Sequence, residues 1–169
     1  MSTRSPGAGL TEIEIIQNPA LGAYLLWLYG LSFQREREIP SSVLLSFLVL
    51  PLLLHKPTVR LISSTYLRSG LALFAAKYAE AREDLLAVQA RTAALRSLTL
   101  QSLGVGATTR LLTIDYAAGT VRANQLDSDL SAPRLPERLK SLPSAAEKLG
   151  HWFAISGPYQ VATTLRVEF

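Results

Sequence analysis

Few side chains in this 169-residue chain could do acid–base or metal chemistry, and those few are dispersed. The two histidines, His55 and His151, lie far apart, and no cluster of His, Asp and Glu has the spacing of metal ligands. The absence of cysteine excludes disulfides, thiol nucleophiles and thiolate metal sites. We therefore expect no metal site and no cofactor.

Catalytic motifs are missing as well. Gly104-Val105-Gly106 lacks the Gly, Lys and Ser/Thr that complete a phosphate-binding loop, and the chain has no Gly-x-Ser-x-Gly nucleophile elbow. Acid–base work needs two perturbed carboxyl groups in one pocket, but the carboxylates fall in separate predicted elements. These are Asp115, Glu83, Asp84, Asp127 and Asp129. The sequence therefore predicts no catalytic residue and no enzyme activity.

One polar constellation stands at a predicted helix end, where His55, Lys56 and Thr58 surround Pro57. On a rigid, proline-fixed turn these side chains offer hydrogen-bond donors to a partner. They also suit a helix C-cap, because His and Lys there favour the helix dipole and can bond the last carbonyls. Both interpretations stay open, and all three residues are candidate partner contacts.

Trp152 and Phe153 also allow two interpretations. They dock a short helix on the core, or they anchor a partner, since Trp is enriched in interface hot spots. Both are therefore candidate partner contacts. The basic residues are scattered although the net charge is +4, and charge alone is weak evidence for nucleic-acid binding. The candidate DNA contacts are Arg91, Arg96, Arg110 and Arg122.

The elements that must position these residues centre on the apolar run 43–54, VLLSFLVLPLLL. It is shorter than the roughly 20 apolar residues that cross a bilayer, so it predicts a helix buried in a core. Charged residues make up only 18% of the chain, so part of the surface is expected to be apolar, as at protein interfaces. An interfacial membrane helix would need a face rich in Lys and Arg, which this run lacks. No membrane is therefore expected as a partner, although membrane-surface binding is a third possible class of function.

Asn18 and Pro19 predict the start of a helix over 19–34. Ser41 or Ser42 caps a second helix over 42–55, which packs against the first to form the core. Pro51 is expected to kink or split this second helix, and Pro57 to end it. An exposed connection follows over 58–69. The region 69–103 is helical, with a break near 80–83, and Gly104 and Gly106 end it.

Alternating apolar residues predict a β-hairpin over 110–124. The prolines of 126–143 indicate a linker, with a helical turn at 137–140. Ser144 and Glu147 form a capping box that opens a further helix.

Helices followed by a hairpin have the order of a winged-helix module, so the expected fold is mainly α with one β-hairpin (α+β), a winged-helix-like accessory domain. Its expected parts are a disordered segment 1–11, a helical core with the hairpin as wing at 12–125, the linker 126–143, and C-terminal helices packing on the core at 144–169.

Several stretches together resemble one family over residues 15–169. They are NPALGAYLLWLYG at 18–30, LSFLVLPLLLHKPT at 45–58, the Ser/Thr-containing stretch 64–67, and AAEKLGHWFAISGPYQVATTLRVEF at 145–169. The family is the middle component of bacterial ABC three-component systems. The proline-rich insert after the hairpin and the ending 167–169 depart from its pattern.

The resemblance implies a non-catalytic adaptor that links an SMC/Rad50-like ABC ATPase to an effector protein, in defence against phage and other mobile elements. DNA contact within the complex and self-association remain open. A cytoplasmic location is expected, since the opening MSTRSPGAG does not resemble a secretory signal. The rival class is a winged-helix DNA-binding protein or regulator.

Overall fold

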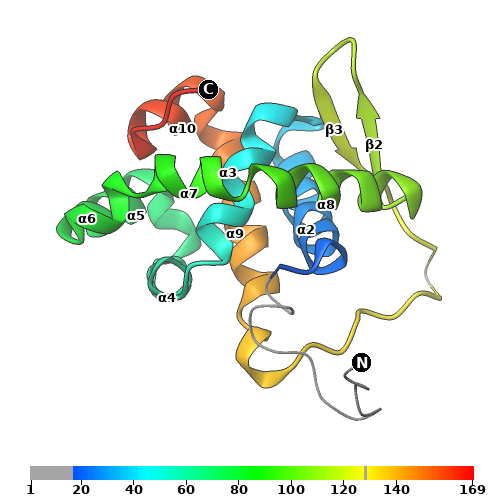
Figure 1. Ribbon diagram of the computed structural model, residues 1–169, viewed down its shortest axis with the longest axis horizontal. Helices are drawn as coiled ribbons and strands as arrows, with labels where there is room; N and C mark the ends of the chain where they lie inside the picture. The colour runs from blue at the N-terminus through cyan, green and yellow to red at the C-terminus, as the bar shows by residue number, and fades with distance from the viewer. Residues whose placement is uncertain (1–16, 128) are drawn as a thin grey trace, which may run out of the picture.

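The computed structural model describes residues 17–127 and 129–169, so the predicted disordered segment 1–11 lies outside the described residues. The chain is mainly helical with one small antiparallel sheet, which confirms the expected mainly α, α+β class (Figure 1). The elements are α2 Pro19–Arg37, β1 Ser41–Ser42, α3 Val43–Leu53, α4 Lys56–Ser64, η1 Leu67–Ser69, α5 Gly70–Glu80, α6 Arg82–Leu86, α7 Val88–Ala94, α8 Arg96–Thr108, β2 Leu112–Asp115, β3 Thr120–Ala123, η2 Glu137–Leu139, α9 Leu142–Ser156 and α10 Pro158–Leu165.

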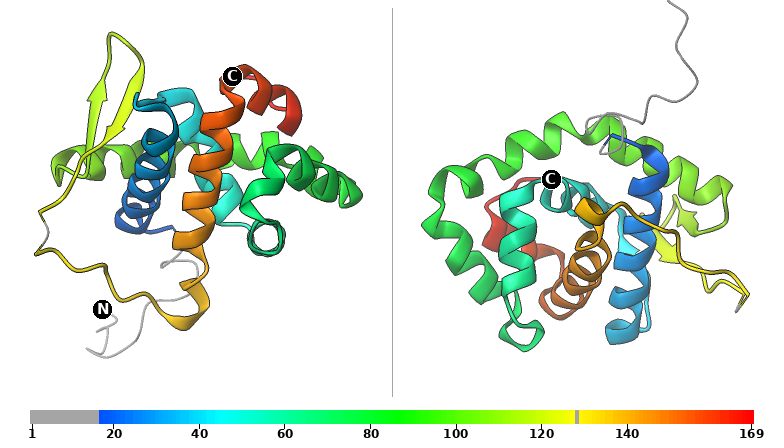
Figure 2. Two further views of the ribbon diagram at one scale, coloured as in Figure 1. Left: turned by 180° about the vertical axis from the view of Figure 1, so that it is seen from behind. Right: turned by 90° about the horizontal axis from the view of Figure 1, so that it is seen from below.

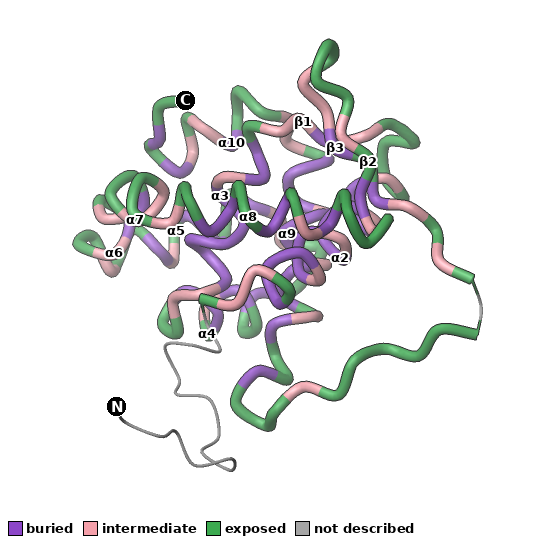
Figure 3. Tube along the Cα trace, turned by 45° about the vertical axis from the view of Figure 1, so that its right-hand side comes forward, coloured by how far each residue is buried: buried purple, intermediate pink, exposed green. Residues whose placement is uncertain are grey.

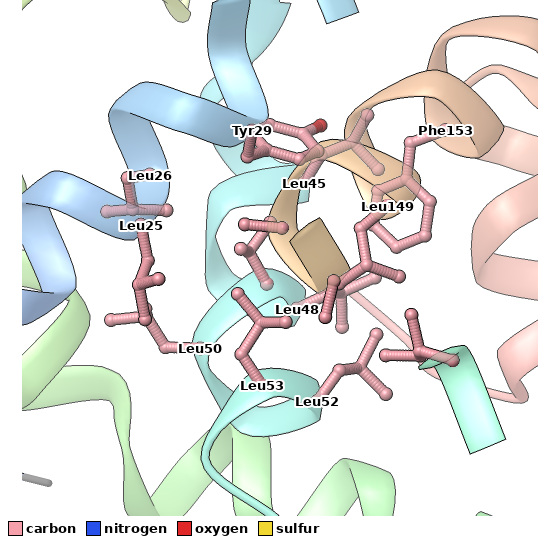
Figure 4. Close-up of a cluster of buried hydrophobic side chains, with 14 of the residues drawn as sticks. Leu25, Leu26, Tyr29, Leu45, Leu48, Leu50, Leu52, Leu53, Leu149 and Phe153 are labelled. Carbon is pink, nitrogen blue, oxygen red and sulfur yellow. The ribbon is translucent and has the colours of Figure 1, made fainter. Parts of the chain in front are cut away.

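The apolar run forms α3, which is buried at the centre of the molecule, as predicted. Figure 4 shows its leucines between side chains of α2 and α9. Ser42 caps α3, because its hydroxyl accepts a hydrogen bond from the amide of Leu44. Within the described ranges no single helix is long and apolar enough to cross a membrane. α3 and α4 taken together have the length and apolar composition of a spanning segment, but the chain bends by 100° between them.

α2 is the helix on which the other elements converge. It packs most extensively on α9 and next on α8, so the pairing of α2 with α3 is not the main contact of the core, contrary to expectation. Glycines permit these close approaches. A Cβ on Gly150 of α9 would lie 2.3 Å from the carbonyl oxygen of Tyr29, and one on Gly22 would lie 2.1 Å from Ser102 Oγ. Such distances are possible only where the side chain is absent.

The predicted starts of α2 and α3 are confirmed, whereas Pro51 does not split its helix and the predicted role of Pro57 is wrong. Asn18 caps α2 by accepting a hydrogen bond from the amide of Ala20. Pro51 lies within α3, which is not split and continues to Leu53. Pro57 lies in the first turn of α4, where its missing N–H costs no intrahelical bond, so residues 58–69 are mostly helical and not an exposed connection.

The predicted break near 80–83 is confirmed at Ala81, and further breaks fall at Ala87 and Leu95. Gly104 and Gly106 do not end the helical region, because α8 continues through both. Gly106 is needed for packing: a Cβ there would lie 2.5 Å from the Leu112 side chain of β2. Gly106 therefore marks a close contact between α8 and β2 and not the end of a helix.

The predicted hairpin is confirmed, with Leu112 opposite Ala123 in an antiparallel pair of strands. Sequence analysis missed β1, whose two residues pair with β3 and give the sheet order β1-β3-β2. The side chain of Gln34 in α2 fixes the hairpin to the helices. Its Nε2 donates to the carbonyl of Ala123 at 3.0 Å, and its Oε1 accepts from the Ala123 amide at 2.7 Å.

After β3 the chain runs as an extended, largely exposed linker before it returns to the helices at η2 (Figures 2 and 3). η2 confirms the helical turn predicted at 137–140. The capping box does not form. α9 begins at Leu142, with Pro143 in its first turn, and Ser144 Oγ donates instead to the carbonyl of Ser141 at 3.2 Å.

The glycine contacts give a direct test of the core. Gly150→Ala should lower the free energy of unfolding by about 3 kcal/mol, because the new methyl group collides with the α2 backbone. Gly104→Ala is the matched control in another helix, where a Cβ has no neighbour within 4 Å. It should leave stability unchanged or raise it by up to about 1 kcal/mol. Urea unfolding followed by circular dichroism measures both, and equal effects would refute the proposed contact.

Candidate partner-contact surfaces

A polar cluster joins the α3–α4 corner to α5 and α7. His55 Nδ1 lies 2.7 Å from Thr58 Oγ1, which lies 2.9 Å from the hydroxyl of Tyr78. Arg91 donates to the same Tyr78 hydroxyl and, at 3.2 Å, to the carbonyl of Asp84. The structure therefore brings together three residues that the sequence analysis assigned to two different surfaces: His55, Thr58 and Arg91.

This arrangement corrects three interpretations. Thr58 is fully buried, so it is not a partner contact, and Arg91 is directed inward, so it is not available to DNA. Buried hydroxyl groups need hydrogen-bond partners, and these residues supply them to one another. His55 is not a C-cap of α3, because it stands at the N-cap position of α4. Among these candidates only Lys56 is exposed, and His55 is partly so.

Burial lowers the pKa of His55 below its ordinary value, and the positive charge of Arg91 lowers it further. The carboxylate of Asp84, 3.7 Å from His55 Nε2, opposes this shift. Burial likewise raises the pKa of the Tyr78 hydroxyl. Both shifts favour the neutral forms at neutral pH, so the cluster is held chiefly by hydrogen bonds around one arginine.

The C-terminal aromatic residues belong to the core. Trp152 is 1% exposed and Phe153 is fully buried, so neither ring can anchor a partner, and the docking interpretation is correct. Trp152 stacks on Phe74 with ring centroids 5.5 Å apart and donates its indole N–H to the Leu67 carbonyl at 2.9 Å. These contacts attach α9 to η1 and α5.

Lys148 lies on the same face of α9 as Trp152, one helical turn earlier. Its ammonium group donates to three carbonyls at the end of α4, those of Ile62, Ser63 and Thr65, at 3.2, 3.0 and 2.9 Å. A cation there satisfies free carbonyls and favours the helix dipole. The segment 145–153 therefore attaches α9 to α4 and η1, and no pattern in the sequence indicates which carbonyls Lys148 bonds.

The other candidate DNA contacts are exposed but do not form one cluster. Arg96 begins α8 and Arg110 follows its end, which places them about 20 Å apart along the helix at 1.5 Å per residue. Arg122 lies on the exposed face of β3, opposite Thr113. Contact with DNA stays a prediction for these three residues.

A groove that sequence analysis missed lies where the end of α2, the hairpin turn and the α9–α10 corner meet. It has a volume of about 270 Å³. We call it the hairpin groove; it is lined by Phe33, Arg37, Ile39, Pro40, Ser42, Ala118, Gly119, Thr120, Ala154, Gly157 and Pro158. Most of these residues are apolar or small, so the groove suits a hydrophobic side chain better than a charged one.

Large apolar side chains are exposed in and beside the hairpin groove. Ile39 is 54% exposed on its rim, and Tyr159, next to the lining residue Pro158, is 86% exposed. Ile155 is also exposed and follows the lining residue Ala154. No local sequence pattern marks them: Ile39 follows the end of α2, and Tyr159 stands in the first turn of α10, which begins at Pro158.

Within the described ranges no group of three or more His, Cys, Asp and Glu residues could hold a metal ion. The structure does offer a groove with exposed apolar side chains at its rim, and an exposed Lys56 at the α3–α4 corner.

The family model described as ABC-three component (ABC-3C) system Middle Component 3 matches residues 7–169. No curated protein and no solved structure matches the chain.

The polar cluster predicts a pH dependence of stability. Because the pKa of His55 is lowered in the folded protein, the unfolded chain binds more protons below about pH 6.5, the ordinary value. The contribution of neutral His55 is therefore complete above that pH and is lost as the pH falls. The free energy of unfolding of the wild type minus that of His55→Gln should be largest above about pH 7 and should shrink toward pH 5. Urea unfolding at each pH measures this difference, and a difference that does not vary with pH would contradict the assignment.

Proposed function

This chain belongs to the family of Middle Component 3 of ABC-three component systems, and on that premise we propose that it is a non-catalytic adaptor linking an SMC/Rad50-like ABC ATPase to an effector protein. A middle component acts within a multi-protein system, so protein partners are expected. The adaptor would act in a cytoplasmic complex that defends a bacterium against phage and other mobile elements. Self-association within that complex is a further proposed interaction.

The observation that carries the proposal is the exposed apolar surface at the hairpin groove. Ile39 and Tyr159 are exposed although the chain has ample apolar residues elsewhere for its core. Exposed apolar side chains around a concave site are typical of protein interfaces, where aromatic residues are enriched. The groove also combines three segments distant in sequence, so it exists only in the folded protein.

The polar cluster around His55 is used to hold the fold together, which supports the proposal that the chain catalyses no reaction. His55, Thr58, Tyr78 and Arg91 hold the three helices α4, α5 and α7 together by mutual hydrogen bonds. None of them faces the hairpin groove. A nucleophile or general base needs access to a substrate, and these groups are occupied in maintaining the fold.

The adaptor role predicts that Ile39→Asp weakens the complex with the ATPase and the effector at least about tenfold, because it places a charge in a desolvated contact. Leu86→Asp is the matched control, since Leu86 on α6 is also 54% exposed but does not line the groove. Size-exclusion co-elution of the three purified proteins, followed by titration calorimetry, measures both variants.

Two results would count against this proposal in different ways. If the wild-type chain eluted alone beside its two partners, the adaptor role would be wrong. If Leu86→Asp broke the complex and Ile39→Asp did not, the hairpin groove would not be the contact.

The alternative function is DNA binding by a winged-helix arrangement. The specific observation in its favour is the order of elements, in which α8 leads directly into the β2–β3 hairpin and β1 extends the sheet beside β3. Arg110 and Arg122 are exposed near the base and on the face of this hairpin. In a winged-helix protein such positions contact DNA phosphates. This function would not require the ATPase or the effector to be present.

Under this alternative, the double variant Arg110→Glu/Arg122→Glu should lose duplex-DNA affinity at low salt. The affinity of the wild type should fall steeply as salt is added, because phosphate contacts release counterions. Arg82→Glu, an exposed change on α6, is the control for a charge reversal away from the hairpin. Fluorescence anisotropy with a labelled duplex measures the affinities, and no binding by the wild type at low salt would remove this function.

A further inference from the structure

Two neighbouring pockets, separate from the hairpin groove, flank η2 at the end of the linker. They share the lining residue Leu139 and have volumes of about 180 Å³ and about 350 Å³. The larger pocket is bounded by Leu21 and Tyr24 of α2 and by Leu135 and Pro136 of the linker. We call the whole the linker groove.

The two ends of the linker groove differ in chemistry. The end at α2 is apolar, whereas Lys56, Arg60 and Arg138 surround the smaller pocket over a floor of leucines and a valine. No Asp or Glu is among the described residues that line either pocket. The cations come from α4 and from η2, so folding brings like charges to one pocket.

The start of α4 adds to the positive potential of the smaller pocket. α4 begins at Lys56, and the side chain of its N-cap residue His55 bonds the Thr58 hydroxyl and no backbone amide of the first turn. The positive end of the helix dipole is thus uncompensated by a capping side chain beside the three cations. Arg60 and Arg138 are both exposed and form no hydrogen bond or ion pair with described residues.

From this charge pattern we propose that the linker groove binds an acidic–apolar peptide segment of a partner protein. Carboxylates would bind at Arg60 and Arg138, and a neighbouring aliphatic or aromatic side chain would enter the apolar end beside Tyr24 and Leu135. Arginine suits carboxylates because its planar group can donate two parallel hydrogen bonds. The apolar end favours a peptide over nucleic acid, whose phosphates would leave that end unused.

This inference rests on the proposed adaptor function, because the segment belongs to one of the other two components. It also assigns a role to the linker: Leu135 and Pro136 form one wall of the binding site, so the extended linker is held where a partner segment would lie against it.

The test uses a fluorescein-labelled peptide of about ten residues, long enough to extend ~33 Å, with leucine and phenylalanine in one half and glutamate in the other. Titrated into the full-length protein and followed by anisotropy, it should bind the wild type. Arg60→Glu and Arg138→Glu should each weaken binding at least about tenfold, since each removes a charge-assisted hydrogen bond and adds repulsion. Leu135→Ser should weaken binding of this peptide as well.

Arg82→Glu is the matched control, because it makes the same change of charge on exposed α6 and should alter affinity less than about twofold. A second peptide with lysine in place of glutamate should not bind. Equal binding of both peptides, or equal effects of the three arginine variants, would overturn the proposal.

Other occupants give distinct results that also overturn it. If the peptide bound only after residues 1–16 were deleted, the groove would belong to this chain's own N-terminal segment. If duplex DNA displaced the peptide and required the same arginines, the ligand would be nucleic acid. A chain that co-elutes with the other components but binds no acidic peptide would refute this inference and leave the adaptor role intact, whereas peptide binding without co-elution would refute the adaptor role.

Discussion

The backbone contact between α2 and α9 is the constraint on which the rest of the structure depends. Gly150 approaches the carbonyl of Tyr29 so closely that any side chain would collide with it. At the same crossing, Ser32 Oγ donates to the Glu147 carbonyl at 2.7 Å. This pair of helices forms two sides of the space in which α3 is buried (Figure 4). A wider separation would leave cavities beside the leucines of α3, and each cavity costs stability.

Polar side chains then fix the outer helices to this core at a few points. Lys148 binds the end of α4, Trp152 binds the η1 carbonyl of Leu67, and Arg91 binds Tyr78. Two of these residues, Lys148 and Trp152, stand in the C-terminal segment by which the family is recognised, and so does Gly150. The family-like C-terminal segment therefore contains determinants of the fold, and it also contributes Ala154, Gly157 and Pro158 to the hairpin groove.

The difference between local and long-range contacts explains which parts of the structure could be predicted from the sequence. Local signals were sufficient for the caps at Asn18 and Ser42, for the buried helix α3 and for the hairpin, because each depends on neighbouring residues. Pro57 and Gly106 were misread as helix ends, since their roles depend on a second helix start and on a contact with β2. The two grooves were missed altogether. Each is formed by segments far apart in sequence, and an exposed Ile or Arg has no local pattern that marks it.

The long separation of α2 and α9 along the chain has a consequence for synthesis. The hydrogen-bonded residues Ser32 and Glu147 are 115 positions apart. At ribosomal rates of chain elongation, α2 and the strongly apolar α3 emerge roughly 6–20 s before α9, the helix that covers them. During that interval the nascent polypeptide presents its most aggregation-prone stretch to the cell. Production of this subunit is thus expected to depend on chaperone capacity.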